Sequence, residues 1–589
     1  MNPANKNDKI TSIKRIRLLY AALILIIAVF ALRLFYLQII SYGHYRAAAL
    51  SDQLKQYEIP AERGTISAYE GDNVLPIVLN QQLFIVYADP VNVKKPGVAA
   101  AKLSGVLGID EAKLEKQITT KNTRYVVLAK KAEPATKNKI TALKLPGIGV
   151  VAQDYRTYPQ GALASQLLGF VNDEGKGVYG IEQALNKELS GKAGELKAIT
   201  DANGIPLAAS KDNTRENPVD GKDLVLTVDL AMQQQLESIL AEGVKNAKAP
   251  SGSALIMDTH TGAIKAMANV PTYDPSQYFK YDDPNIFQNG TVTHSIEVGS
   301  TMKTLTTAAA MNQGVVNTNT SYYDPSFWII NDFRVTNIEE DGGAGTRTLK
   351  DILNLSLNTG VTWELMQMGG GQINLKARQA WYDYLVNHYQ FGKATGIEQG
   401  YESEGYVPKP QENGAGINLT YANTAFGQAL TATPIQMAGA LTSVVNGGTY
   451  YQPHLVDKYV EQDGKKVDVK PKIVKQNVVS KNTADALIPL MQYVVDNHTF
   501  NPKFDQNRYT VGGKTGTAQI AKPGGGYYDD QFNGTYAGFV GGDNPDYVIV
   551  VFVYKPTIKG YAGSAAAQPI FGSLAHMLID NSYVNPKGQ

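Results

Sequence analysis

The chain has 589 residues, of which 43% are hydrophobic and 19% charged, so it carries apolar material for more than one folded domain. Its formal net charge of +1 argues against a protein that binds nucleic acid through a basic surface. The absence of cysteine excludes disulfide bonds, cysteine nucleophiles and thiolate metal sites, and the seven histidines form no HExxH zinc motif.

The N-terminus predicts a membrane anchor. Residues 18–32 (LLYAALILIIAVFAL) contain no charge, and five basic residues precede them against one acid, Asp8. A helix continued to Ile40 would be roughly 34 Å long, enough to cross a hydrocarbon core of about 30 Å. Because the basic flank lies on the N-terminal side, we expect a cytoplasmic tail over 1–17, a single span over 18–40 and an extracytoplasmic remainder, on the periplasmic or cell-wall side.

A cleaved signal peptide is the alternative interpretation of this segment. Its candidate cleavage site, the alanines 47–49, lies further beyond the apolar run than such sites usually lie. This spacing favours an uncleaved anchor. No other segment of the sequence is long and apolar enough to span a membrane.

Residues 41–218 predict an extended mixed domain with small cores. Strand-like runs at 83–90 and 124–131 alternate with short helical patterns at 110–118 and 134–144. Residues 198–223 are rich in Asp, Asn, Gly and Pro, a composition typical of loops at a domain boundary.

A second domain is predicted over residues 219–589. Its expected elements are a strand at 223–229, a helix at 230–244, a hairpin at 253–270, an apolar strand at 546–556 and a closing helix at 565–579. Strands near both ends of the domain and a mainly helical middle favour an α/β (α+β) fold.

Ser300 and Lys303 form the first candidate site. Residues three apart share one face of a helix, and Gly299 allows a sharp turn before the serine. A helix N-terminus favours a developing oxyanion, and a neutral lysine would accept the proton of the serine hydroxyl. A capping serine followed by a surface lysine gives the same short pattern, so the pair alone does not decide.

Ser356 and Asn358, in the segment NLSLNTG, form the second candidate site. Side chains two residues apart in an extended or turn segment point the same way, so the hydroxyl would relay a proton and the amide would hold a substrate carbonyl. The same spacing recurs at Ser480 and Asn482. There we predict that Ser480 caps a helix instead.

Lys514, Thr515, Gly516 and Thr517 form the third candidate site. A strand with this sequence would carry a cation and two hydroxyls, and Gly516 would let a ligand approach the backbone. Lys514 would be the second cation that lowers the pKa of Lys303, and the threonines would bind a carboxylate. A turn between two strands is the alternative interpretation of this motif.

The three motifs occur in the order SxxK, SxN and KTG, which is the pattern of penicillin-binding proteins and class A β-lactamases. The chain resembles a class B penicillin-binding protein over nearly its whole length. Blocks that also resemble the family are RLFYLQI, ERGTI, YRTYPQGALASQLLGFVNDEGKGVYGIEQALNKELSGKAGE, NVPTYDPSQY, FGKATGI and AFGQALTATPIQMAGALTSVVNGG. The segment FNGTYAGFVGGDNPDYVIVVFV resembles the division-specific branch more than the elongation branch.

The resemblance implies a pedestal domain of the dimerisation type over 41–218 and a transpeptidase domain over 219–589, with an antiparallel sheet flanked by helices. It implies a peptidoglycan D,D-transpeptidase that needs no metal or organic cofactor. Ser300 would attack the carbonyl between two terminal D-alanines of a stem peptide, and Lys303 would take its proton. Ser356 would pass a proton toward the leaving amine.

The remaining roles implied by the resemblance concern substrate binding. Asn358 would hold the substrate backbone, and Lys514, Thr515 and Thr517 would bind the terminal carboxylate. The N–H groups of Ser300 and Thr517 would form the oxyanion hole, in which one donor is typically worth about 3 to 4 kcal/mol of transition-state stabilisation.

The sequence departs from the family at two places. Val298 and Met302 stand where proline and phenylalanine are common, which changes packing around the serine and leaves the chemical groups in place. Residues 63–73 (RGTISAYEGDN) lack the Asp-Arg-Asn run of the family motif, which affects contacts within the pedestal.

The implied ligands are peptidoglycan stem peptides and β-lactam antibiotics, and the implied partners are a polytopic glycan polymerase and other divisome proteins. The sequence does not exclude two alternative functions, an elongation-specific transpeptidase and a D,D-carboxypeptidase. The long pedestal and the single anchor argue against a β-lactamase. Three intact motifs argue against a silent scaffold, and the 17 residues before the span are too short for the signalling domain of a β-lactam sensor.

Overall fold

The computed structural model of the chain describes residues 6–45, 54–199, 213–337, 343–411, 414 and 416–588. Distances between Cα atoms divide the chain into two compact units. One comprises Met1–Glu62 and Gly191–Asp220, and the other comprises Arg63–Ser190 and Gly221–Gln589. The alanines at 47–49, considered above as a cleavage site, lie outside the described residues.

The first unit contains the predicted apolar helix. Helix α1 (Lys6–Phe35) continues into a π-helical turn, η1 (Tyr36–Ile40). Residues Lys14–Ile40 contain an 18-residue window with a mean hydropathy of 2.6 and form the one helix of the described chain that is long and apolar enough to span a membrane. The unit also contains an antiparallel sheet in the order β1-β8-β9, formed by β1 (Leu54–Ile59), β8 (Gly194–Ile199) and β9 (Thr214–Glu216).

The N-terminal part of the second unit is built on a mixed sheet. Its strands are β2 (Ile66–Glu70), β3 (Asn73–Ala88), β4 (Val126–Ala132), β5 (Ile148–Thr157), β10 (Asp223–Asp229), β18 (Val456–Val460) and β19 (Lys466–Asp468). They follow the order β19-β18-β10-β2-β3-β4, and β5 also pairs with β3. The small elements here are α3 (Pro96–Leu107), α4 (Glu111–Ile118), α5 (Pro134–Ala142), α6 (Ser165–Leu168), β6 (Phe170–Val171), β7 (Gly177–Val178), α7 (Gly180–Ala184) and α8 (Asn186–Ser190).

The predicted strands and helices of this region are confirmed, and so is its small core. Leu103 of α3, Leu114 of α4 and Ile140 of α5 pack with Phe84 and Val86 of β3 in a separate hydrophobic cluster. These helices carry one narrow apolar stripe each, which is enough to cover one end of a sheet.

Strand β10 was predicted correctly, but it joins this mixed sheet and not the five-stranded sheet on which the C-terminal region is built. It pairs in parallel with β2 and antiparallel with β18. Leu224, Leu226 and Val228 are fully buried there. An apolar strand fits any sheet that covers both of its faces, so its sequence alone does not select its neighbours.

Three blocks that resemble the family meet at a buried ion cluster in this region. Arg63 of ERGTI and Arg156 of YRTYP both pair with Glu182 of GIEQALN, whose side chain has no exposed surface. The Arg156 Nε donates to one carboxylate oxygen at 2.8 Å, and Arg63 donates to the other. Two charge-assisted contacts compensate the buried carboxylate and tie three distant segments together.

The C-terminal region is built on an antiparallel five-stranded sheet in the order β12-β11-β23-β22-β21. Its strands are β11 (Ser251–Asp258), β12 (Ile264–Val270), β21 (Thr510–Ala521), β22 (Tyr527–Gly541) and β23 (Pro545–Tyr554). The hairpin predicted at 253–270 and the strand predicted at 546–556 are therefore confirmed. Strands β11 and β23, which lie far apart in the sequence, pair directly with each other in this sheet.

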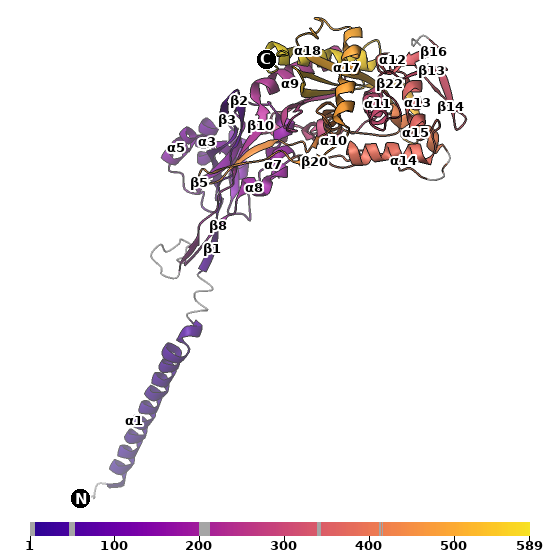
Figure 1. The fold of residues 1–589 in the computed structure, drawn as a ribbon. Coiled ribbons are helices and arrows are strands. Elements are labelled where there is room, and N and C mark those ends of the chain that lie inside the picture. Colours follow the sequence, from indigo (N-terminus) through magenta and orange to yellow (C-terminus); the bar gives the residue numbers. More distant parts are fainter. Residues whose placement is uncertain are drawn as a thin grey trace, which may run out of the picture. The chain divides into compact units, whose positions relative to one another are not determined.

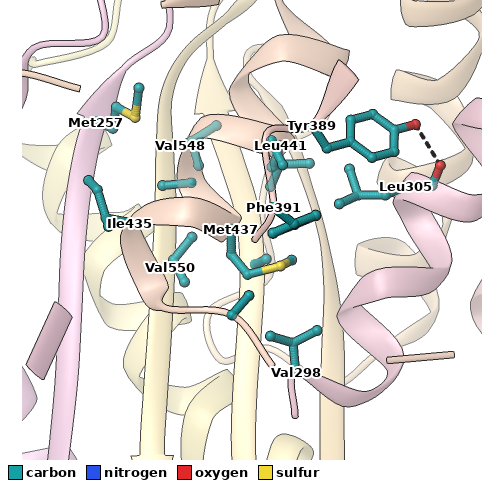
Figure 2. Close-up of a cluster of buried hydrophobic side chains, with 14 of the residues drawn as sticks. Met257, Val298, Leu305, Tyr389, Phe391, Ile435, Met437, Leu441, Val548 and Val550 are labelled. Carbon is teal, nitrogen blue, oxygen red and sulfur yellow. Dashed lines mark hydrogen bonds between the residues drawn. The ribbon is translucent and has the colours of Figure 1, made fainter. Parts of the chain in front are cut away.

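Strand β23 shows how helices cover both faces of this sheet. Ile549, Val551 and Val553 belong to the cluster formed with α9 (Leu230–Asn246) and α18 (Gln568–Asp580), which lie together in Figure 1. Val548 and Val550 alternate with them and face α16 (Pro434–Val445). Figure 2 shows these two valines beside Ile435, Met437 and Leu441 of that helix. Successive side chains of a strand point to opposite faces of the sheet, so alternate valines and isoleucines of β23 contact different helices.

The helical middle of the region was also predicted. Its elements are η2 (Pro275–Lys280), η3 (Pro284–Phe287), α10 (Gly290–Thr293), η4 (Gly299–Thr301), α11 (Met302–Asn312), β13 (Ser321–Asp324), β14 (Phe327–Ile330), β15 (Phe333–Thr336), β16 (Gly345–Thr348), α12 (Leu349–Asn354), α13 (Asn358–Met368), α14 (Leu375–Asp383), η5 (Tyr384–His388), α15 (Ile417–Ala425), β17 (Tyr450–Tyr451), β20 (Ile473–Lys475), α17 (Lys481–Asn497) and η6 (Gly563–Ala567). Ser480 caps α17 as predicted, because its side chain accepts from the Thr483 N–H.

Candidate active site

Ser300 lies at the start of a helix, as predicted, in the short 3₁₀ turn η4 that leads into α11. The hydroxyls of Thr301 and Thr535 donate to the Val298 carbonyl oxygen at 2.9 and 2.8 Å and hold the turn. Val298 and Met302 are fully buried, and Figure 2 shows Val298 beside the α16 cluster. Val298 and Met302, the departures from the family pattern next to the serine, are therefore apolar packing residues.

Close backbone contacts fix the position of this turn. Gly299 has φ +60° and donates its N–H to the Gly427 carbonyl oxygen at 3.0 Å. A β-carbon on Gly516 of β21 would lie 2.6 Å from the Val298 carbonyl oxygen, so only glycine fits. The serine turn and the KTG strand approach each other this closely because Gly516 has no side chain.

Lys303, Ser356 and Lys514 form one buried hydrogen-bonded group. The Lys303 amine donates to the Ser356 hydroxyl oxygen at 3.1 Å and also to the Ser356 carbonyl oxygen. The Lys514 amine donates to the same hydroxyl oxygen at 3.0 Å. Both lysines are buried. Burial, with a further contribution from the Lys514 charge, lowers the pKa of nearby His498.

The turn between α12 and α13 presents the second motif. Ser356 has φ +58°, a left-handed conformation that serine rarely adopts and that functional sites often contain. Asn358 is the first residue of α13, and its side-chain amide donates to the Thr336 carbonyl oxygen at 2.9 Å. The motif is a turn rather than an extended segment, one of the two conformations predicted.

The third motif lies on a strand, so the alternative of a turn between strands is wrong. Lys514, Thr515, Gly516 and Thr517 are consecutive residues of β21, which is the edge strand of its sheet. The Thr517 hydroxyl oxygen accepts from the Gly563 N–H at 2.9 Å. The Thr515 carbonyl and hydroxyl oxygens accept from the Lys514 amine at 3.1 and 3.4 Å.

A cleft of about 920 Å³ opens above this group. Its lining includes Ser300, Asn358 and Thr517, one residue from each of the three motifs. The other lining residues are Phe333, Arg334, Val335, Thr336, Asn337, Leu419, Asn423, Phe426, Gln428, Gln519, Phe532, Gly560, Tyr561 and Ala562. The structure therefore brings the motifs together, with Lys303, Ser356 and Lys514 joined beneath and Ser300, Asn358 and Thr517 at the surface of the cleft.

Sequence reasoning missed Glu297, which connects three segments around the cleft. One of its carboxylate oxygens accepts from the Ala429 N–H and from the Tyr527 hydroxyl, both at 2.8 Å. Burial raises the pKa of Glu297, and these two donors oppose that shift. Its place three residues before Ser300 was the only signal available in the sequence.

The lining residues Arg334, Phe333 and Phe532 were also not singled out from sequence. Arg334 and Phe333 lie on a hairpin, β14–β15, that has no motif of its own. In the described part of the chain, no group of three or more His, Asp and Glu side chains is arranged to hold a metal ion.

Comparison with known proteins identifies the class. Residues 252–576 match the penicillin binding protein transpeptidase domain, and residues 58–226 match the penicillin-binding protein dimerisation domain. The first match alone covers more than half of the chain. The chain belongs to the class B penicillin-binding proteins, and it is a serine-type transpeptidase of that family.

Individual relatives agree with this assignment. Stage V sporulation protein D of Bacillus subtilis is 30% identical, over 97% of this chain and 87% of that protein. The peptidoglycan D,D-transpeptidase FtsI of Escherichia coli K12 is 26% identical, over 97% and 92%. Penicillin binding protein 3 of Mycobacterium tuberculosis, solved in complex with aztreonam, superposes with a TM-score of 0.67 at 25% identity, over 90% of this chain and 98% of that one.

Proposed function

We propose that the chain is a peptidoglycan D,D-transpeptidase of septal cell-wall synthesis, acting through an acyl-enzyme on Ser300. The observation that carries this proposal is that Lys303 and Lys514 both donate to the Ser356 hydroxyl oxygen, and that one residue of each motif, Ser300 among them, lines the same cleft. This arrangement supplies a nucleophile, a buried base and a proton carrier within one site.

In the acylation step, the Ser300 hydroxyl oxygen attacks the carbonyl carbon of the penultimate D-alanine. The serine proton passes to the neutral amine of Lys303. Coulomb repulsion between two buried amines that share one hydroxyl favours a state in which one of them is neutral. The C–N bond then breaks, and the leaving D-alanine amine receives its proton through the Ser356 hydroxyl.

The resulting ester is resolved by the amine of a neighbouring stem peptide. This amine attacks the ester carbonyl, gives up a proton to the same lysine and serine group, and releases the Ser300 hydroxyl with a new amide bond formed. The N–H groups of Ser300 and Thr517 are proposed as the oxyanion hole, and Lys514 with Thr515 and Thr517 as the site of the terminal carboxylate. Asn358 is proposed to hold the donor backbone.

The primary experiment exposes the purified full-length chain to a fluorescent penicillin and weighs the adduct. We expect one stable adduct per chain in the wild type and none in Ser300→Ala. Ser480→Ala is the matched control, since it removes a serine of the other SxN sequence that only caps a helix. Absence of an adduct on folded wild-type protein would refute the acyl-enzyme mechanism and favour a silent scaffold.

The D,D-carboxypeptidase alternative differs only in the final acceptor. We propose transfer to an amine, so a mixture of stem pentapeptide and acceptor peptide should give a cross-linked dimer. Release of D-alanine with water as the sole acceptor, at saturating acceptor peptide, would favour the carboxypeptidase.

A septal role is supported by the relatives. The E. coli protein is named peptidoglycan D,D-transpeptidase FtsI, and the segment FNGTYAGFVGGDNPDYVIVVFV of this chain resembles the division-specific branch of the family. Localisation of a fluorescent fusion to the division site supports the septal role, and a distribution along the side wall favours elongation.

For the organisation of the chain, we propose that residues 1–17 are cytoplasmic and that residues 18–40 span the membrane. Residues 41–218 then form the pedestal and residues 219–589 form the transpeptidase domain, both outside the membrane.

We also propose that the span and pedestal contact a polytopic glycan polymerase and other divisome proteins. Copurification of such a polymerase, lost when residues 18–40 are replaced by an unrelated span, tests this partner. Acylation by the fluorescent penicillin should be unchanged when a metal chelator is added. This result is a further check on a mechanism without metal.

A further inference from the structure

The active-site cleft has one charged side chain in its described lining. Arg334 of β15 carries it, and the lysines of the catalytic group are buried below and do not line the cleft. No carboxylate of the described chain lies in an ion pair with Arg334. Among the described lining residues, the Arg334 guanidinium therefore gives the cleft wall its one positive charge.

The guanidinium is held in a defined position. It lies over the ring of Phe327 on the neighbouring strand, 4.0 Å from the ring centroid. Such a cation–π contact fixes the plane of the guanidinium and leaves its N–H donors available to an anion. Phe327 and Ile329, which pairs with Arg334 across the hairpin, are also exposed and lie on the same face as the arginine.

The hairpin that carries Arg334 is anchored to the motif helix α13. The Trp328 indole N–H donates to the Thr359 carbonyl oxygen at 3.0 Å, and the Asn358 amide donates to the Thr336 carbonyl oxygen at 2.9 Å. These two bonds fix the distance between the arginine and the proposed donor-binding amide. A substrate placed by Asn358 is therefore placed relative to Arg334 as well.

We propose that Arg334 selects a stem peptide that bears a carboxylate in addition to the terminal one. This inference rests on the proposed function and names a substrate feature of the same site. The terminal carboxylate is assigned to the KTG strand, a different wall of the cleft. A second carboxylate pairs with the arginine through two parallel N–H···O bonds, a geometry that lysine does not reproduce.

Two positions of a stem peptide offer this chemistry. One is a carboxylate on the side chain of the third residue, and the other is the α-carboxylate of a γ-linked glutamate. Each is compared with its amide in an otherwise identical pentapeptide, and kcat/KM for release of D-alanine is measured with the full-length protein. We expect wild type to prefer the acid over the amide roughly tenfold or more in one of the two pairs, the size of a charge-assisted bond.

Three variants make the test specific. Arg334→Gln should reduce the preference to near one, and Arg334→Lys should retain only part of it. Lys350→Gln is the matched control, because Lys350 also lies over an aromatic ring, that of Tyr493, but does not line the cleft. It should keep the wild-type preference.

The acylation rate with benzylpenicillin separates this inference from the proposed function. It should stay within about twofold in Lys350→Gln, since Lys350 does not line the cleft. An unreactive wild type refutes the proposed function itself. A reactive wild type that does not distinguish acid from amide in either pair, or an Arg334→Gln variant that keeps the preference, overturns the assignment of Arg334.

Discussion

A β-carbon on Gly427 would lie 2.0 Å from the carbonyl oxygen of Gly299, one residue before the candidate nucleophile. Gly427 has φ +85° and accepts a hydrogen bond from the Gly299 N–H. The two glycines therefore set the position of the serine turn by direct backbone contact, across more than a hundred residues of sequence.

Gly427→Ala should displace the Ser300 turn. The added methyl group meets backbone that cannot move without shifting the serine, so we expect penicillin acylation to fall at least tenfold, with a lower midpoint of thermal unfolding. Gly314→Ala is the control, because Gly314 has φ +71° and open space around it. It should cost about 1 kcal/mol of backbone strain and leave acylation unchanged. Equal acylation by both variants would contradict the prediction.

Ser356→Ala should slow acylation without unfolding the protein. It removes the oxygen that accepts from both Lys303 and Lys514, and with it the proposed proton carrier. Loss of a positioned acid–base group typically costs about 10²- to 10⁴-fold in rate. The second-order rate constant for benzylpenicillin measures the effect. Ser480→Ala should lose about 1 kcal/mol of stability through its helix cap and retain the wild-type rate.

Glu364→Gln should stabilise the protein more at high pH than at low pH. Burial raises the pKa of Glu364 to about 8, and Thr307 is the only residue of the described chain that donates to its carboxyl oxygens. Between the ordinary pKa of the unfolded chain and about 8, unfolding ionises the group, so wild-type stability falls as pH rises. The advantage of the variant should grow by roughly 1 kcal/mol per pH unit in this range. Denaturant unfolding at pH 5 and pH 7.5 measures it, and a pH-independent difference would contradict it.

Glu182→Ala should strongly destabilise the N-terminal part of the second unit. It leaves Arg63 and Arg156 buried without their shared carboxylate, a loss of about 3 to 5 kcal/mol for a buried pair. Asp485→Ala breaks an exposed pair with Lys481 on one helix and should cost no more than about 0.5 kcal/mol. Differential scanning calorimetry compares the two. Similar small shifts for both variants would show that the buried cluster contributes little.

Local pattern was sufficient to predict several elements of both domains and all three motifs. The strands at 223–229 and 546–556 and the hairpin at 253–270 follow from β-branched and apolar runs, whose period is a local property of the chain. The helix start at Ser300 follows from a glycine and a polar residue before an apolar segment. The long apolar helix near the N-terminus follows from the length and hydropathy of its segment alone.

The sequence pattern of an element does not predict which other elements it pairs with or packs against. Strand β10 is apolar on both faces and would fit either sheet, so only the three-dimensional packing placed it between β2 and β18. Arg334 has no motif, and its relation to Asn358 depends on a hairpin that folds back onto α13. Glu364 is an ordinary helix residue in sequence, and its neutral state depends on complete burial.

The sequence by itself determined the chemical groups of this protein: a serine and lysine one helical turn apart, a second serine near an amide, and a lysine on a strand. Tertiary structure decided that the Lys303 and Lys514 amines meet at one hydroxyl oxygen, and that the cleft above them carries a single described charge. The physical reason is that residue types and their period are local, whereas distances between segments are set by close packing of glycine backbones and buried side chains.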